Sequence, residues 1–572
     1  MVAIREAAAL TLFSFPRTHG TYIAAGVLIL LALFPRFERQ TIFLLEGALA
    51  RFSRRTVVVM FSLFSFVIGA RLLALSRLPV PVSGVHDSFS YLLLADTLAH
   101  GRLTNPPHPM WVSFETFHVN WLPTYASMYP PAQGVVLALG EILGHPWIGV
   151  LLSDAAMCGL IFWALWAWMP TRWAFLGAAL VAVKFGIASY WMNSYWGGAV
   201  AAIGGALVLG AVARVIKRSR PRDAVLLGLG LAILANSRPY EGLVFAIPAG
   251  LWLLIWLIRR PGTSGDERPA SQRRVLAPLL VVLAITAASM AYYNWRVTGN
   301  ALVMPHMLNM STYHTAAVFL WQHPKPEKKY RNKQFDEFYN DWERDAYEPT
   351  LDAMIRVTKE KRNNIRVTFL WPGLLLALPG LPFVLRDRKF RFLLATLVVT
   401  SIGLIVVVWS QPHYAAPLTC AIYALIVQSI RHLRTMRVRK LFVGRALSRA
   451  IAVILMMNIF QLVRTGACDP KPDTCEGDTS RFATAEKLAH KPGKHLVMVR
   501  YDADHNVHDE WVYNSADIDA AKVVWARELD ARQNRNLFAY FHDRQVWLVT
   551  PDDDNTYLEP YTAPGVPLLD SQ

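Results

Sequence analysis

One stretch of this chain places acidic, basic and aromatic side chains directly after a hydrophobic run. It begins VPVSGVHDSFSYLLLADTLAHGRL at Val80 and ends YASMYPP at Pro131. The apolar run over residues 57–78 would deliver Asp87 to one surface of a membrane. A carboxylate placed there is costly unless it is used, so Asp87 is the first candidate for chemistry, as a general base. An N-cap of the following helix is the alternative for the same residue.

Further reactive side chains lie in turns that we expect on the same membrane face. They combine carboxylates, imidazoles, phenols and guanidinium groups, whereas the turns on the opposite face are basic only. We therefore expect a site at the outer membrane interface, open to lipid and water together. The residues expected to bind substrate there are His86, Tyr91, Glu115, His118, Tyr129, Arg238, Tyr240, Glu241, Arg296, His413 and Tyr414.

Some of these residues have competing interpretations. The planar fork of Arg238 suits a phosphate, but a local ion pair with Glu241 would explain the turn NSRPYEG equally well. Asp96 lies nine residues after Asp87, roughly half a helical turn away, so it is interpreted as an exposed acid and not as a catalytic partner. The histidine spacings fit no compact metal motif. We expect no metal and no cofactor, with a divalent metal as the less favoured alternative.

The elements that position these residues follow from composition. The chain has 572 residues, of which 54% are hydrophobic and 17% charged; a soluble chain usually carries about 25% charged residues. The apolar residues form repeated runs separated by short basic patches. Because backbone groups in lipid must be satisfied within the segment, these runs are predicted to be helices of a polytopic α-helical membrane protein.

The net charge of +17 reports topology and not a nucleic-acid partner. Basic clusters lie in alternate connections and are absent from the connections between them, as the positive-inside rule requires. This alternation predicts eleven or twelve spans within residues 1–463, with outward loops at 80–131 and 294–366. The count depends on residues 1–34, which are interpreted as an uncleaved span or a re-entrant helix. The predicted spans are Val57–Leu78, Trp147–Trp168, Trp173–Ala188, Gly197–Val215, Ala224–Ala235, Leu243–Ile258, Val275–Tyr293, Val367–Leu385, Phe392–Trp409, Tyr414–Ile430 and Ile451–Val463.

Residues 464–572 have ordinary polarity and predict a small soluble α/β domain outside the membrane. HLVMVRY, AKVVWARE and RQVWLVTPD are typical of strands, and ARQNRNLFAYFHD is typical of a helix. Cys468 and Cys475 in CDPKPDTC are expected to form a disulfide, with two unpaired thiols as the alternative. Cys158 and Cys420 lie in apolar runs and are expected to be core residues.

The segments HDSFSYLLLADTLAHGRL and YPPAQG resemble the GT-C membrane glycosyltransferases. The similar branch contains the protein O-mannosyltransferases and the lipid A aminoarabinose transferase, and is glycosyltransferase family 39-like. The resemblance implies that Asp87 deprotonates the acceptor and that the donor is a sugar on a polyprenyl phosphate, reached laterally from the bilayer. Two positions depart from the family pattern. Ser88 stands where many relatives carry a second acid. Tyr129 stands where many carry Lys, which would leave the phosphate to Arg238 or Arg296.

The expected function is inverting transfer of a sugar to an acceptor protein, lipid or glycan at the outer face of a bacterial inner membrane. The C-terminal domain would then be periplasmic, and the partners would be the lipid-linked donor, membrane lipids and the acceptor, without nucleic acid. Two alternatives remain open on the sequence. One is a transporter or flippase of a lipid-linked glycan, and the other is a non-catalytic envelope assembly protein.

Overall fold

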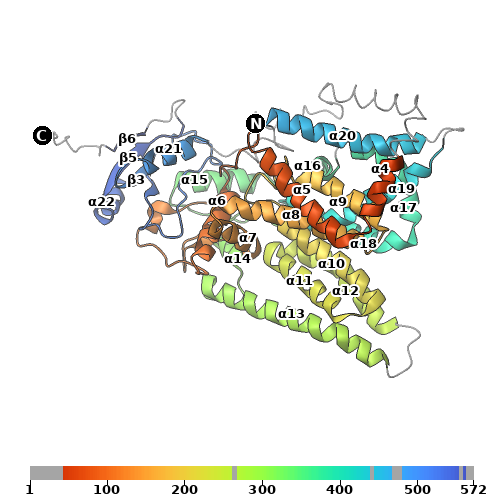
Figure 1. Ribbon diagram of the computed structural model, residues 1–572. Helices are drawn as coiled ribbons and strands as arrows, with labels where there is room; N and C mark the ends of the chain where they lie inside the picture. Colours follow the sequence, from red (N-terminus) through yellow and green to blue (C-terminus); the bar gives the residue numbers. More distant parts are fainter. Residues whose placement is uncertain are drawn as a thin grey trace.

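The computed structural model describes residues 43–259, 267–370, 372–437, 443–466, 479–552 and 558–561. These residues form a bundle of helices with a small sheet domain at one end (Figure 1). The first described helix is α4 (Phe43–Phe52). The expected disulfide between Cys468 and Cys475 and the segment 1–34 lie outside the described residues. Cys158 and Cys420 are buried within helices of the bundle, as predicted.

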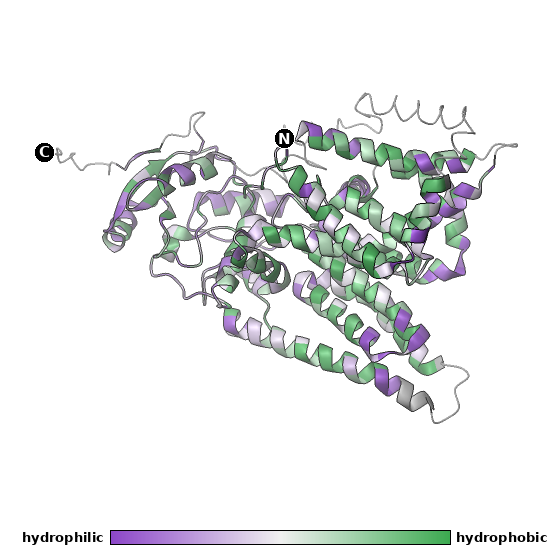
Figure 2. Ribbon diagram, viewed as in Figure 1, coloured by the Kyte–Doolittle hydropathy of each residue, from purple (hydrophilic) through white to green (hydrophobic). Residues whose placement is uncertain are grey.

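Eight described helices are long and apolar enough to cross a membrane. Figure 2 shows the apolar residues running along them, while the sheet domain is more polar. This confirms the prediction of a multi-pass helical membrane protein. The eight are built from α5 (Thr56–Leu73), α8 (Pro146–Leu165), α10 (Ala199–Arg218), α12 (Pro239–Arg259), α13 (Glu267–Thr298), α18 (Arg391–Val406, preceded by η5, Arg388–Phe390), α19 (Thr419–Thr435, preceded by η6, Pro412–Leu418) and α20 (Val443–Thr465).

The number of spans differs from the eleven or twelve predicted. Two predicted spans correspond to α9 (Thr171–Phe185) and α11 (Pro221–Ser237), with 15 and 17 residues. Helices of these lengths reach about 22 and 26 Å and are shorter than the eight, although α11 still leads from the basic end of α10 to Arg238 at the end that carries the site. The span predicted at 367–385 is bent by 103° between α16 (Leu351–Phe369) and the pair η4 (Pro372–Gly380) and α17 (Leu381–Arg386). By length and composition, the described residues therefore contain eight helices that could each cross a membrane, or nine if the bent pair is one span, besides the shorter α9 and α11.

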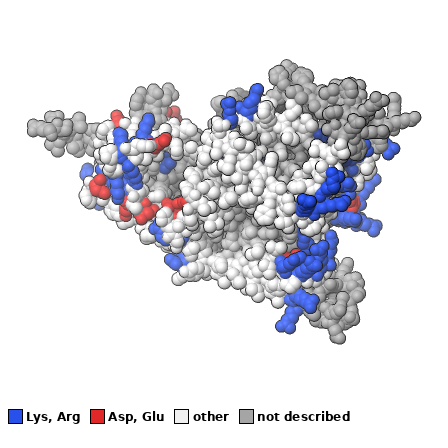
Figure 3. Space-filling view, viewed as in Figure 1, with Lys and Arg blue, Asp and Glu red and all other residues white. Residues whose placement is uncertain are grey.

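Charge is distributed along the axis of the bundle. In Figure 3, Lys and Arg gather at the end opposite the sheet domain, and a belt of uncharged surface lies between. The last turn of α10 carries Lys217 and Arg218, and that of α19 carries Arg434. This arrangement agrees with the positive-inside pattern on which the predicted topology rests.

Two packed helices outside the spans carry most of the first outward loop. They are α6 (His86–Ala99) and α7 (Pro131–Ile142), and the latter begins directly after the Pro-Pro turn. Gly134 of α7 faces Leu94 so closely that a Cβ would lie 2.3 Å from the Leu94 Cγ atom. Between the two helices, η2 (Trp111–Phe114) leads to a short hairpin of β1 (Val119–Asn120) and β2 (Ala126–Ser127).

The C-terminal domain contains the predicted strands and helix. The sheet has the order β4-β3-β5-β6, with β3 parallel to both β4 and β5 and β6 antiparallel to β5. Its elements are α21 (Thr479–Ala489), β3 (Lys494–Val499), β4 (Val523–Arg527), α22 (Ala531–Tyr540), β5 (Arg544–Val549) and β6 (Leu558–Pro560).

The sheet domain is fastened to both outward loops by buried polar contacts. Arg527 pairs with Glu510 inside the domain and donates to Gln334 Oε1 at 2.9 Å. Tyr125 of the first loop donates to the Asn514 carbonyl at 3.0 Å. Gln334 belongs to the second loop, which holds α14 (Pro305–Thr312), α15 (Lys333–Asp336) and the π-helix η3 (Glu337–Arg344).

Candidate functional site

The chain is fixed in place as it leaves α5 toward the site. Arg71 is fully buried and donates to the carbonyls of Leu78 at 2.7 Å and Pro79 at 2.9 Å, and to Asn193 Oδ1 at 2.8 Å. Three charge-assisted hydrogen bonds of this kind are the strong ones in proteins. They set the path of the segment that precedes Asp87.

Asp87 lies in the first turn of α6 and is not its N-cap. The helix begins at His86, and its N-cap is Val85, whose backbone is extended and makes no side-chain capping bond. The N-cap interpretation of Asp87 is therefore wrong. The carboxylate is half-buried and lies at the N-terminal end of the helix, where the aligned peptide dipoles place partial positive charge.

A hydrogen-bonded chain joins Asp87 to two residues that follow it in the same loop. The hydroxyl of Tyr129 donates to Asp87 Oδ1, and Nδ1 of His118 lies 3.2 Å from that hydroxyl oxygen. Because the single phenolic proton goes to Asp87, Nδ1 of His118 must be the donor in the second bond. Tyr91 stacks on Tyr129 with ring centroids 4.3 Å apart. Burial, together with the Asp87 charge, raises the pKa of Tyr129, so the phenol keeps its proton.

His118 adopts a backbone conformation that L residues rarely take. Its φ is 58°, in the left-handed region. Its carbonyl accepts from Ser90 Oγ at 2.7 Å and from the Met128 amide at 3.1 Å, which holds the conformation. Strain of this kind concentrates at functional sites. Burial lowers the pKa of His118, so the imidazole is neutral at pH 7.

His86 connects the site to the C-terminal domain. Its Nε2 lies 3.1 Å from the Val507 carbonyl and its Nδ1 lies 2.7 Å from the Tyr513 hydroxyl. Since a carbonyl only accepts, Nε2 carries the proton and Nδ1 accepts from Tyr513. Burial lowers the pKa of His86 well below its usual value. His86 thus orients the loop beside Asp87 and is itself enclosed.

Arg238 follows α11 and faces the same group of tyrosines. Its guanidinium lies over the Tyr414 ring, 4.3 Å from the centroid. Its charge also opposes the upward shift that burial gives to the pKa of Tyr91. Among the described residues, no direct ion pair within 4.0 Å joins Arg238 to Glu241, although the two charges attract each other across a longer distance.

A crevice opens beside this group between neighbouring helices. It lies where the outer ends of α11 and α13 meet the starts of α7 and α14, and α13 turns most of its surface away from the protein. Its lining surface is mainly apolar. The lining residues include Pro130, Asn236, Met290, Tyr293, Asn294 and His306.

Several predicted substrate-binding residues have other partners. Glu115 is buried and accepts from Tyr313 at 3.1 Å and from Arg331 at 3.3 Å. The hydroxyl of Tyr240 donates to the Gly403 carbonyl at 3.0 Å. These contacts fasten loops, and they give Glu115 and Tyr240 structural roles.

Two further predicted residues lie outside the group around Asp87. Arg296 is exposed on α13 and donates to the Tyr292 hydroxyl at 3.2 Å. His413 is buried behind Tyr414, with Nδ1 3.1 Å from the Tyr190 hydroxyl. The structure thus brings together Asp87, Tyr129, His118, Tyr91, Arg238 and Tyr414, with His86 behind Asp87.

Sequence reasoning missed residues contributed by the second loop and the C-terminal domain. His314 Nδ1 lies 2.7 and 2.8 Å from the two carboxylate oxygens of Glu343, and both side chains are buried. Glu343 belongs to η3, and π-helices are rare and frequent at functional sites. His508 lies against Trp342 and near His86. No spacing in the sequence signals these residues, because each comes from a different segment.

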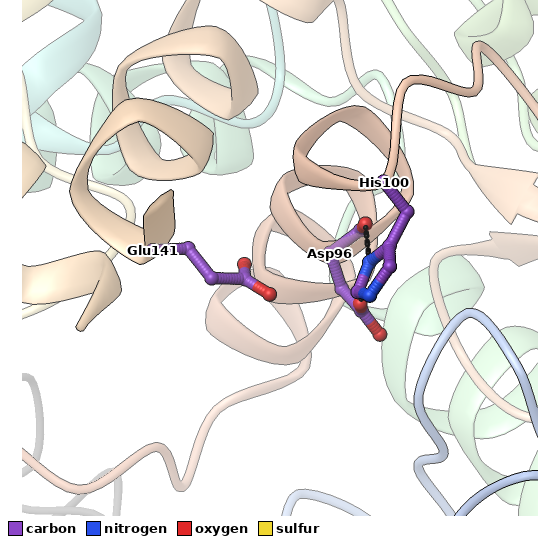
Figure 4. A group of neighbouring side chains, drawn as sticks. All are labelled: Asp96, His100 and Glu141. Carbon is purple, nitrogen blue, oxygen red and sulfur yellow. Dashed lines mark hydrogen bonds and ion pairs between the residues drawn. The ribbon is translucent and has the colours of Figure 1, made fainter. Parts of the chain in front are cut away.

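A separate group of metal-ligating side chains lies at the other end of α6 (Figure 4). Asp96, His100 and Glu141 have ligand atoms within 4.8 Å of one another, so by distance the group could hold a metal ion. Asp96 already pairs with His100 Nδ1 at 2.9 Å and accepts from the Ala516 amide at 2.7 Å. Burial and the Asp96 charge raise the pKa of Glu141 to about 7. Among the described residues no such group of three includes Asp87.

No protein-family model and no curated protein matches the chain. Solved structures similar to it are GT-C membrane glycosyltransferases, the class that the sequence resembles. ArnT from Cupriavidus metallidurans bound to undecaprenyl phosphate is 14% identical, with a TM-score of 0.49, covering 87% of this chain and 93% of that one. The Archaeoglobus fulgidus oligosaccharyltransferase AglB with an inhibitory peptide and a dolichol-phosphate is 11% identical, with a TM-score of 0.45, covering 87% and 69%. The same archaeal protein tethered to an acceptor peptide is 11% identical, with a TM-score of 0.43. The match covers 77% of the present chain and 62% of the archaeal protein.

Proposed function

We propose that this protein is a glycosyltransferase that moves a sugar, with inversion, from a polyprenyl-phosphate donor to an acceptor at the outer membrane interface. The observation that carries the proposal is the hydrogen-bonded chain Asp87–Tyr129–His118, with Arg238 close by, at the end of the bundle opposite the basic clusters. It joins a carboxylate base and a phosphate-binding cation at the membrane surface.

Asp87 is the general base in this proposal. Tyr129 occupies Oδ1, which leaves Oδ2 for the acceptor hydroxyl. The acceptor proton passes to Oδ2 while the acceptor oxygen bonds to the anomeric carbon. The bond from that carbon to the phosphate oxygen breaks, and its electron pair leaves with the polyprenyl phosphate. Attack opposite the leaving group inverts the configuration at this carbon.

Arg238 stabilises the leaving phosphate in this proposal. A guanidinium offers a planar fork of donors that matches phosphate oxygens, and Tyr414 holds its face. A small hollow lined by Asn236, two residues before Arg238, lies where α11 meets α13, a helix whose surface is mostly exposed. In this proposal the isoprenoid chain of the donor approaches from the bilayer along that exposed helix, so no nucleotide-binding fold is needed.

We place the site at the outer face of a bacterial inner membrane, with the C-terminal domain in the periplasm. The basic end of the bundle supports a cytoplasmic side opposite the sheet domain. The C-terminal domain contributes Val507 and Tyr513 beside Asp87, so an acceptor protein, lipid or glycan would meet it on reaching the base.

The test is transfer from a radiolabelled polyprenyl-phosphate sugar by the full chain in nanodiscs, with membrane and periplasmic extract as the acceptor source. Asp87→Asn is expected to lower the transfer rate by about 10²- to 10⁴-fold while the labelled lipid still binds. The matched control is Asp96→Asn, the same change at the other end of α6. Equal rates for Asp87→Asn and the unmodified protein would exclude Asp87 as the base. Movement of the lipid across a bilayer without transfer would favour a flippase.

A further inference from the structure

α16 is a basic amphipathic helix within the second outward loop. Its buried face includes Ala353, Val357 and the stem of Lys361. Its exposed side chains include the cations Arg356, Lys359, Arg362 and Arg366. At about 100° per residue these four fall within an arc of about 120°, so they form one stripe along the helix.

Apolar side chains share this exposed face. Leu351 is 73% exposed and Ile355 is 42% exposed. On the same helical projection both lie within or beside the arc of the cations. A face that mixes Lys and Arg with large apolar side chains is typical of helices that lie in a membrane interface.

α16 is fixed at the end of the bundle that carries the candidate site. The buried ammonium of Lys361 donates to the carbonyls of Leu404, Ile405 and Val407, at the C-terminal end of α18. That end is opposite the basic segment 386–391, from which α18 begins. α16 also packs against η6, which carries Tyr414. The stripe therefore lies on the side of the membrane where the positive-inside pattern predicts few cations.

Among the described residues, the cations of the stripe are not paired with acidic side chains, although Asp352 falls within the same arc. Within the part of the chain that the structure describes, none of the four forms an ion pair, although Asp352 and Glu360 lie on the same helix. Arg356 donates to the Ala346 carbonyl at 3.2 Å, and Arg366 donates to Asn363 Oδ1 at 2.8 Å. Four exposed charges thus remain for an external anion.

We propose that the exposed face of α16 docks on the anionic lipid headgroups of the leaflet on the site's side. The stripe supplies charge complementary to phosphodiester headgroups, and Leu351 and Ile355 enter the headgroup boundary between them. The apolar residues and the continuity with the membrane-crossing α18 favour a lipid surface over a soluble anion. This docking holds the second loop, and with it His306, His314 and Glu343, over the bundle. It does not depend on sugar transfer.

Hydrogen exchange of the full chain in nanodiscs tests this proposal. Amides of residues 351–366 are expected to exchange at least about fivefold more slowly with about 30% phosphatidylglycerol than with phosphatidylcholine alone. About 1 M NaCl, which shortens the Debye length to about 3 Å, is expected to remove most of that difference. The double variant Arg362→Gln/Arg366→Gln is expected to exchange equally in both lipids.

The matched control is Lys325→Gln/Lys329→Gln, which removes two exposed charges from the same loop outside the helix. It is expected to keep the full dependence on anionic lipid. Equal exchange in both lipids for the unmodified chain would overturn the proposal, as would loss of the dependence in the control. Protection by inorganic phosphate in neutral nanodiscs would also overturn it, because the stripe would then bind a free anion.

Discussion

The hydroxyl of Tyr129 donates its proton to Asp87 Oδ1, while Nδ1 of His118 approaches the same hydroxyl from the other side at 3.2 Å. Tyr129 stands where many members of the resembled family carry Lys. A phenol that keeps its proton cannot neutralise a phosphate, but it can orient a carboxylate. In our proposal Tyr129 therefore orients the base, Asp87, and Arg238 binds the phosphate.

We expect Tyr129→Phe to lower the transfer rate about 10- to 100-fold, because Asp87 loses the bond that directs Oδ2 toward the acceptor. The apparent affinity for the lipid-linked sugar should stay within about twofold, since the phenol makes no contact with the phosphate. Initial rates at varied donor concentration measure both quantities. Tyr91→Phe is the control, because its ring still stacks on Tyr129. A large loss of donor affinity in Tyr129→Phe would instead assign Tyr129 to donor binding.

We expect Arg238→Gln to weaken binding of the polyprenyl phosphate by about 10- to 100-fold, as removal of a charged hydrogen-bond partner does. Arg296→Gln is the matched control. It makes the same change at the outer end of a neighbouring helix, but its side chain is exposed beside Tyr292. Equilibrium binding of a fluorescent polyprenyl phosphate in nanodiscs compares the two. If Arg296→Gln weakens binding more than Arg238→Gln, the phosphate lies on α13 and our assignment is wrong.

We expect the folded protein to lose stability as the pH falls below about 6.5. Burial lowers the folded-state pKa of both His86 and His118. Below the unfolded-state pKa, the unfolded chain therefore binds protons that the folded chain does not bind. Stability therefore rises with pH up to the unfolded-state value and is lost below it. Thermal unfolding in detergent between about pH 5 and 7.5 measures the slope.

The variant His86→Asn should flatten this pH dependence, whatever it does to the melting temperature at pH 7.5. His100 is exposed and its pKa is raised by the Asp96 carbonyl and carboxylate, so its contribution has the opposite sign. His100→Gln should then leave the acid slope unchanged or make it steeper. An unchanged slope in His86→Asn would mean that this imidazole does not limit acid stability.

We expect transfer to continue after metal ions are removed, because the proposed chemistry needs only Asp87 and Arg238. Dialysis against EDTA, followed by rate measurement with and without added Zn²⁺ or Mn²⁺, checks this. If EDTA stops transfer, the double variant Asp96→Asn/Glu141→Gln shows where the required metal ion binds. Transfer by that variant that still depends on added metal would place the ion near Asp87. Loss of transfer in that variant that added metal does not restore would place the ion at the Asp96 group.

The sequence was informative where contacts are local and uninformative where they are distant. Asp87 could be placed at the start of α6 because a hydrophobic run and a helical pattern surround it. Its bond to Tyr129 joins residues 42 positions apart, and no periodicity encodes that distance. The pair His314–Glu343 depends on how α14 and η3 fold over the bundle, which is tertiary packing. Glu115 and Tyr240 have side chains suited to binding a substrate, but both are hydrogen-bonded to other segments of the protein.

Helix length shows the same limit. Hydropathy finds apolar runs, and it found α9 and α11, but it does not tell a crossing helix from a shorter one packed among others. Most residues of α9 face the interior of the bundle or pack partly against it. A segment of this kind is apolar largely because protein surrounds it, so an apolar run in the sequence does not by itself give the length of the helix.

The contact between the C-terminal domain and His86 has a consequence for biogenesis. His86 and its partner Tyr513 are separated by 427 positions. During synthesis α6, which carries His86 and Asp87, is made long before Val507 and Tyr513, and the His86 imidazole meanwhile has neither partner. In our proposal the site is therefore complete only after the C-terminal domain has folded against it. A chain that is released early would keep the loop around Asp87 without these contacts.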